Sequence, residues 1–185
     1  MLEKTKTFAV AAILTTLAAS PVVAHAQPAA PPAAAEVDPL TESIQTGAKH
    51  VRSVFTQAAE QMSEEDYAFR PTPEVRTLGE ILAHVAGNNY WFCARATGEK
   101  PPVSDVEKTA TTRADIQKAL ASSFDYCEGA YAAMADDAKA DVMVDFMGKP
   151  RPALAVLNFR NYHAMLHWGN VITYMRLRGK VPPAR

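Results

Sequence analysis

Two histidines near the end of the chain, His163 and His167, are four residues apart. On an α-helix this spacing places both side chains on one face, about one turn apart. Helical zinc sites use imidazoles at this spacing. The pair alone leaves two interpretations open: a metal site, or two core histidines that each hydrogen-bond to a nearby acceptor. For an arbitrary pair the second interpretation is the more common one.

Further polar residues share the histidine face of this predicted helix, in the series Val156, Arg160, His163, His167, Asn170 and Tyr174. Unpaired buried polar groups cost about 1–3 kcal/mol each, so such a stripe needs partners. A metal ion would satisfy both imidazoles together.

His84 supplies a third candidate ligand on a second apolar stretch, and Asn88 follows it one turn later. Three neutral imidazoles can hold a divalent ion and leave one coordination position open for water or substrate. Asn88, Asn170 and Arg160 would then lie one turn from the ligands, where they could orient a water molecule or an anionic group. Hydrogen bonding between helices is the alternative role for these three residues.

Four amphipathic or apolar segments are expected to position these side chains. Thr77 and Glu80 form a capping-box pattern at the start of the second segment. Gly98 and Gly179 are typical residues at helix ends. The alternating segment 141–149 predicts a short extended piece packed over the bundle, and no β-sheet is expected. We predict an all-α four-helix bundle with helices at about 40–61, 77–98, 112–134 and 152–178.

The N-terminal region predicts export. Lys4 and Lys6 precede an apolar stretch, and Ala24-His25-Ala26 fits a cleavage site, so residues 1–26 are predicted to be a signal peptide. An uncleaved membrane anchor is the alternative. Residues 27–38 are rich in Ala and Pro and predict a disordered tether, which leaves a folded domain at 39–183. The periplasm is the expected location, with secretion as second choice and no membrane attachment after cleavage.

The remaining candidates carry less chemistry. Cys93 and Cys127 are the only cysteines, and an oxidising compartment permits a disulfide between them; two separate buried thiols are the alternative. Cys93 falls on the helix face opposite His84, so it is excluded as a ligand. His50 is expected at a solvated rim, and His25 would leave with the signal peptide. The run Glu64–Asp66 is expected to be solvated, and Trp91 and Trp168 are expected in the core or a pocket wall.

Several stretches of the chain resemble the DinB/YfiT-like family. These are Thr77-Leu-Gly-Glu-Ile-Leu-Ala-His84, His163-Ala-Met-Leu-His167 and Tyr174-Met-Arg-Leu-Arg-Gly-Lys-Val-Pro-Pro183, with Phe69-Arg70-Pro71 as the lead-in to the second helix. The resemblance implies a four-helix bundle that is often a homodimer. It also implies a divalent metal, which can be zinc, nickel or iron, bound by His84, His163 and His167. We place zinc first because it tolerates such a geometry without redox constraints.

Known activities in the family include transfer to low-molecular-weight thiols and a relationship to a maleylpyruvate isomerase. Those thiols belong to the cytoplasm, which conflicts with the predicted export. We therefore expect a metal-dependent hydrolase or transferase with an unknown small-molecule substrate, and only Tyr174 and Asp145 suggest themselves as acid–base groups. The alternatives are a non-catalytic periplasmic metal-binding protein and a helical interaction module. The net charge of −1 provides no basic footprint for nucleic acid.

Overall fold

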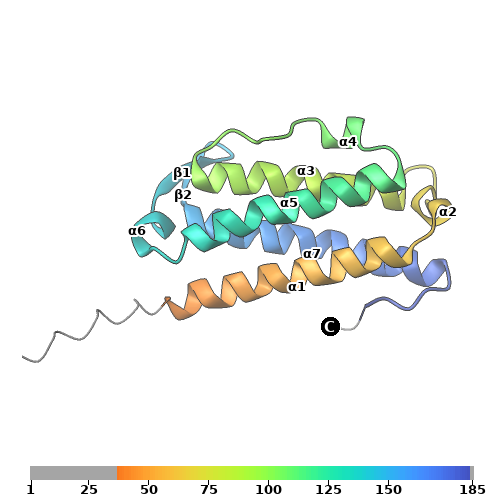
Figure 1. Ribbon diagram of the computed structural model, residues 1–185, viewed down its shortest axis with the longest axis horizontal. Coiled ribbons are helices and arrows are strands. Elements are labelled where there is room, and N and C mark those ends of the chain that lie inside the picture. The colour runs from red at the N-terminus through yellow and green to blue at the C-terminus, as the bar shows by residue number, and fades with distance from the viewer. Residues whose placement is uncertain (1–36, 184–185) are drawn as a thin grey trace, which may run out of the picture. The chain divides into compact units, whose positions relative to one another are not determined.

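The computed structural model describes residues 37–183, and they form a bundle of four long helices (Figure 1). The predicted fold class is therefore confirmed, and the helices agree with the predicted segments to within two residues at either end. Their bounds are α1 (Pro39–Gln61), α3 (Leu78–Thr97), α5 (Arg113–Ala133) and α7 (Ala153–Leu177). The predicted signal peptide and residues 27–36 of the predicted tether lie outside the described residues.

The helices are connected by one long crossover. Helices α1 and α7 run in one direction and α3 and α5 in the other (Figure 1). Helix α3 packs against both α5 and α7, and α1 packs against α7 and α5 on the other side. Because α3 and α5 are parallel, residues 98–112 must return along the length of the bundle. This crossover contains the short helix α4 (Val106–Thr109).

Local hydrogen bonds define the helix ends. The Asp38 side chain accepts from the backbone N–H groups of Leu40 and Thr41 and so caps the start of α1. The capping box predicted for α3 is present: Thr77 Oγ1 accepts from the Glu80 N–H at 3.1 Å, and Glu80 accepts from the Thr77 N–H at 2.7 Å. Gly98 ends α3 with a φ of 75°, a left-handed conformation that favours glycine.

The acidic run Glu64–Asp66 agrees with its prediction at Glu64 and Glu65, which are exposed, and differs from it at Asp66. It forms the short helix α2 (Glu64–Tyr67), and Asp66 is 3% exposed instead of solvated. Its Oδ1 accepts from Arg178 Nε at 2.6 Å, just beyond the end of α7. Asp66 therefore fastens the α1–α3 connection to the C-terminal end of α7. A further short helix, α6 (Asp137–Ala140), follows α5.

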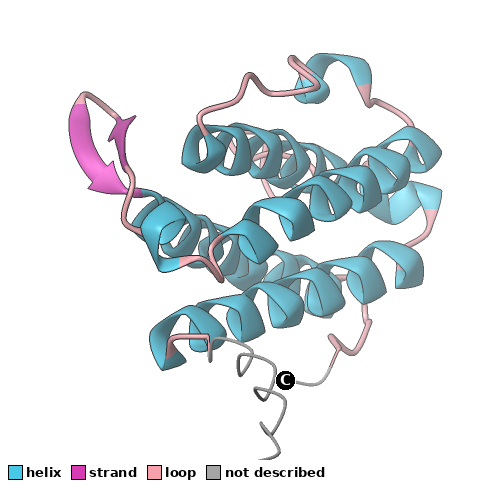
Figure 2. Ribbon diagram, turned by 60° about the vertical axis from the view of Figure 1, so that its left-hand side comes forward, coloured by secondary structure: helices cyan, strands magenta, loops and turns pink. Residues whose placement is uncertain are grey.

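A β-hairpin stands where a single extended segment was predicted (Figure 2). Strand β1 (Met143–Phe146) pairs antiparallel with β2 (Lys149–Pro152). The turn residues Met147 and Gly148 have φ values of 53° and 76°, as a two-residue type I′ turn requires. The expectation of no β-sheet was therefore wrong, although the alternation in β1 is real: Phe146 is buried, whereas Met143 and Asp145 are exposed.

The core fills the space between the long helices. Leu78, Leu82, Val156 and Leu157 are each fully buried. A disulfide joins Cys93 of α3 to Cys127 of α5, with a Cα–Cα distance of 5.4 Å. Of the two alternatives left open for these cysteines, the structure has the disulfide. None of the helices in the described part of the chain has the length and apolar character needed to cross a bilayer.

Candidate metal centre

The structure brings His84, His163 and His167 together between α3 and α7. One ring nitrogen from each lies within 4.8 Å of the other two. The ring centroids are 4.7 Å apart for His163 and His167, and 4.8 Å apart for His84 and His167. The i, i+4 spacing on α7 accounts for the first distance, and the packing of α3 against α7 for the second. The three predicted ligands therefore form one cluster.

Both ring nitrogens of His84 have polar partners. Glu107 Oε1, on the crossover helix α4, lies 2.8 Å from Nδ1. Asn88 Nδ2, one turn along α3, lies 2.8 Å from Nε2. A carboxylate accepts, and the Asn88 amide nitrogen donates, so these two contacts favour the tautomer with the proton on Nδ1 and the lone pair on Nε2. A carboxylate behind a histidine is the usual arrangement where that histidine binds a metal.

The two histidines of α7 are held in their neutral forms. Burial lowers the pKa of His163, and the neighbouring His84 lowers it further. Burial also lowers the pKa of His167 to about 4, with smaller contributions from His163 and His84. A metal ligand must be deprotonated, so these imidazoles have the protonation state that a divalent ion needs.

His167 provides the test of whether the cluster fits a metal. Its Nδ1 is buried and has no hydrogen-bond partner among the described residues. Leaving such a group without a partner costs about 1–3 kcal/mol. Three imidazoles that lie together, one of them with an unsatisfied buried nitrogen, suit zinc, nickel or iron. The donor set of this site therefore fits the divalent ion that the sequence predicts.

An aromatic cluster supports the site from the hairpin side. Phe92 of α3 lies 5.4 Å from the His163 ring, and Phe159 of α7 stacks with the same ring at 6.5 Å. Phe146 of β1 packs against both phenylalanines, at 5.9 Å and 5.2 Å. The hairpin thus acts on the site through packing, since its buried side chain braces the rings that fix the orientation of His163.

A cavity of about 570 Å³ lies between α3 and the crossover. Asn88 and Glu107, the two partners of His84, both line it, together with Trp91, Pro101 and residues 103–108 of the crossover. Its volume falls within the range of small-molecule binding sites. The site therefore combines three metal-ligand donors with adjacent space for a small molecule.

Other residues named from the sequence have different places. Asn88 contacts the cluster as predicted, whereas Asn170 is exposed. Arg160 is 1% exposed and donates from Nε to Asn89 Oδ1 at 2.8 Å, so it took the alternative role of bonding between helices. The Tyr174 hydroxyl donates to the Arg76 carbonyl at 2.7 Å. Asp145 lies on β1 beside Arg95, at 3.9 Å.

The remaining candidates also lie outside the cluster. His50 is partly exposed on α1. Cys93 is in the disulfide, which agrees with its exclusion as a ligand. Trp168 is buried in the core against Phe55, and Trp91 is a wall of the cavity. These two tryptophans have the structural roles that were expected of them.

Glu107 is the functional residue that sequence reasoning missed. It is 23 positions from His84, in a segment between Pro102 and Thr111 that shows no helical periodicity. Its position follows from the path of the crossover, which spacing alone does not reveal. The one available signal is an acidic residue in a connection long enough to cover a site, and that signal is weak.

Residues 48–171 match the model of the DinB superfamily. No curated protein matches the chain. Among solved structures, a DinB-like protein from Bacillus cereus is 17% identical, with a TM-score of 0.63, and the match covers 78% of this chain and 96% of that protein. A DinB-like protein from Bacillus subtilis is 21% identical, with a TM-score of 0.60 and coverages of 77% and 96%.

A third solved structure is a mycothiol-dependent maleylpyruvate isomerase. It is 18% identical to this chain, with a TM-score of 0.58, and the match covers 71% of this chain and 60% of the isomerase. At these identities the three structures establish a shared helical-bundle fold.

Proposed function

Because this chain belongs to the DinB superfamily, we propose that it is an exported metal-dependent enzyme, a hydrolase or transferase that acts on a small molecule. The proposed ligands of the metal are His84, His163 and His167. The observation that carries the proposal is the grouping of three imidazoles from two helices, together with the buried Nδ1 of His167 that has no hydrogen-bond partner among the described residues.

The chain's own residues give this site its chemical character. His84, His163 and His167 would hold a divalent ion, which would supply Lewis acidity at this site. Glu107 holds the proton on His84 Nδ1 and fixes the ring, while the Asn88 amide lies beside Nε2, where it can turn toward a bound small molecule. Trp91 and the crossover line the adjacent cavity.

The cavity favours an enzyme over a protein that only stores or buffers metal. A site that only stores metal needs no space beside its ligands, whereas an enzyme needs a cavity there for its substrate. The cavity of about 570 Å³ shares Asn88 and Glu107 with the histidine site. A non-catalytic metal-binding protein remains the second candidate, and it predicts metal binding without turnover.

The disulfide supports the proposed export. Disulfides persist in the periplasm and outside the cell and are rare in the cytosol. Cys93 and Cys127 lie on adjacent parallel helices and are joined. A periplasmic location removes the cytoplasmic thiols from reach, so we propose a reaction in which no low-molecular-weight thiol takes part. This separates the chain from the mycothiol dependence of the isomerase with the similar fold.

Metal analysis tests the proposal directly. Protein purified without a histidine tag is expected to contain about one divalent ion per chain, measured by inductively coupled plasma mass spectrometry. His163→Ala and His167→Ala are each expected to lose that ion, because two imidazoles hold a divalent ion much more weakly than three.

His50→Ala is the matched control, since His50 is also a helical histidine but lies on α1 outside the cluster. It is expected to keep the ion. Equal metal content in all four proteins would contradict the metal site. Turnover of small ester and amide substrates that disappears together with the metal would distinguish an enzyme from a storage protein.

A further inference from the structure

A second site is indicated by Arg160, whose charge is buried without a counter-ion. The side chain is 1% exposed. Its Nε donates to Asn89 Oδ1 at 2.8 Å and its Nη1 to Asn161 Oδ1 at 3.1 Å, both neutral acceptors. Its Nη2 is buried and has no partner, and Arg160 forms no ion pair with any carboxylate in residues 37–183.

This arrangement is costly unless something completes it. A buried charge normally has a partner of opposite charge, because its desolvation costs several kcal/mol. Burial lowers the pKa of Arg160, but a guanidinium stays protonated in proteins. The rings of Phe124 and Tyr131, at 5.1 Å and 5.9 Å, compensate in part. They leave the Nη2 hydrogens without an acceptor.

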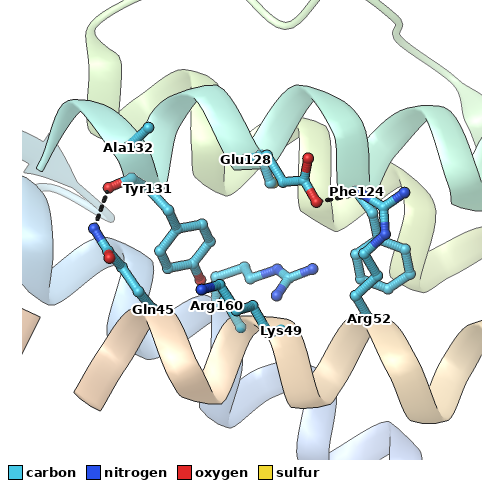
Figure 3. Close-up of a pocket in the computed structure, with 10 residues that line it drawn as sticks. Gln45, Lys49, Arg52, Phe124, Glu128, Tyr131, Ala132 and Arg160 are labelled. Atoms are coloured by element: carbon cyan, nitrogen blue, oxygen red, sulfur yellow. Dashed lines mark hydrogen bonds and ion pairs between the residues drawn. The ribbon is translucent and has the colours of Figure 1, made fainter. Parts of the chain in front are cut away.

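Arg160 lines a cavity of about 280 Å³ between α1 and α5 (Figure 3). It reaches this space from α7, and Phe124, Tyr131 and the disulfide residue Cys127 form apolar walls around it. Ala48 lines the same cavity from α1. These apolar walls are suited to contact the apolar body of a ligand.

The charges at the opening attract anions. Lys49 lines the cavity and has no ion-pair partner in the part of the chain that the structure describes. Arg52 pairs with Asp125 and Glu128, each at 2.7 Å, so the carboxylate of Glu128 at the rim is neutralised. The lining thus carries three cations and one carboxylate.

We propose that this cavity binds a small organic monocarboxylate whose apolar body lies between α1 and α5 and whose carboxylate accepts from Arg160 Nη2. A planar guanidinium matches a carboxylate well. A phosphate would need more donors than the single free nitrogen of Arg160 and the ammonium group of Lys49 provide. The volume limits the ligand to a small molecule, below the usual range for drug-sized ligands.

The carboxylate site is separate from the histidine cluster. Two consecutive residues of α3 face the two sites: Asn88 contacts His84, and Asn89 contacts Arg160. Different residues line the two cavities. The occupancy of the carboxylate site is therefore measurable without reference to the metal or to the proposed reaction.

Titration with sodium benzoate tests the proposal, with the neutral analogue benzamide as the ligand control. Calorimetry on the mature protein is expected to show saturable binding of one benzoate per chain. A hydrogen bond to a charged group corresponds to about a ten- to hundredfold difference in affinity, so benzamide is expected to bind more weakly by that factor.

Two variants test the site independently of each other. Arg160→Gln removes the charge and is expected to reduce benzoate affinity by about ten- to a hundredfold. Ala48→Leu fills the cavity from α1 without touching the charge network, and it is expected to abolish binding while leaving the metal content unchanged. Arg151→Gln, on the exposed hairpin strand, is the matched charge control and is expected to bind like wild type.

The proposal is overturned by any of three results. These are the absence of saturable benzoate binding to the wild-type protein, equal affinity for benzoate and benzamide, and undiminished binding in Ala48→Leu. The last result is informative even if Arg160→Gln fails to fold.

Discussion

At the scale of single residues, the contact between Glu107 and His84 makes a testable prediction. Glu107 Oε1 lies 2.8 Å from His84 Nδ1, and Glu107 Oε2 lies 3.6 Å from Arg76 Nη2. Carboxylates behind ligating histidines commonly contribute ten- to hundredfold to metal affinity. Because Glu107→Gln keeps the shape and removes the charge, we expect about a tenfold loss of metal affinity, measured by competition with a chromogenic chelator.

Asp105→Asn is the matched control for this substitution. Asp105 borders the same short helix, but its carboxylate pairs only with the exposed Lys108, at 3.0 Å. Metal affinity is expected to stay within about twofold of wild type, since exposed ion pairs contribute little. A Glu107→Gln protein with wild-type affinity would show that Glu107 has no part in holding the ligand.

The ligands could be predicted at this scale, but their surroundings could not. Four residues make slightly more than one full turn of an α-helix, so His163 and His167 had to share a face. Arg160 is three residues before His163, which turns its side chain toward the other edge of the same face. Because α7 is packed on most sides, either edge could hold a polar group. Only the position of Asn89 on α3 shows that Arg160 points away from the histidines.

At the scale of elements, Asp66 connects α2 to the end of α7. Burial on its own raises the pKa of this carboxyl, but hydrogen bonds from Arg178 and Ser63 outweigh it and hold the pKa below its usual value. The unfolded chain therefore takes up the proton first as pH falls. The stabilisation is present above about pH 4 and is lost as pH falls through the lower folded pKa.

Asp66→Asn is expected to lower the free energy of unfolding by about 1–3 kcal/mol at neutral pH. The difference from wild type is expected to shrink below about pH 4. Urea unfolding at a series of pH values measures both quantities. Glu65→Gln, which removes the exposed partner of Arg178, serves as control and is expected to cost less than about 1 kcal/mol. A difference that stays constant down to pH 3 would contradict the assigned role.

The hairpin is the element that could be predicted only in part from the sequence. Strand β1 alternates between buried and exposed side chains, and that pattern is visible in the sequence. Strand β2 has the sequence Lys-Pro-Arg-Pro, which has no alternation and carries prolines that disfavour strands. Met147 in the turn has a positive φ that methionine rarely adopts. The packing of Phe146 against Phe92 and Phe159 supports the hairpin, whereas the local sequence carries no signal for the partner strand or the turn.

At the scale of the whole molecule, the homodimer remains a prediction. Tyr162, Met165 and Leu166 are exposed apolar residues on α7, at 60%, 38% and 53%. Clustered apolar side chains on a surface are typical of protein–protein contacts, and we place the dimer contact on this face. Light scattering coupled to size-exclusion chromatography is expected to give twice the chain mass for wild type and the monomer mass for Leu166→Asp.

Val181→Asp is the control for the dimer prediction, because Val181 is more exposed, at 83%, but lies beyond α7. It is expected to leave the mass at that of the dimer. Metal content is measured on both variants, since Leu166 is next to His167 in the chain. A wild-type protein that elutes as a monomer at every concentration would contradict the dimer.

The disulfide also determines whether the chain would stay in one piece after a protease cleaves the crossover. Cys93 precedes the crossover and Cys127 follows it. The bond therefore closes a covalent ring of the chain, and residues 98–112 are part of that ring. A protease that nicks this connection would produce two fragments, one with His84 and the other with His163 and His167. Those fragments would stay linked through α3 and α5. The three histidines would thus remain in one molecule after such a cut, which would favour survival of the site if the protein is exported as proposed.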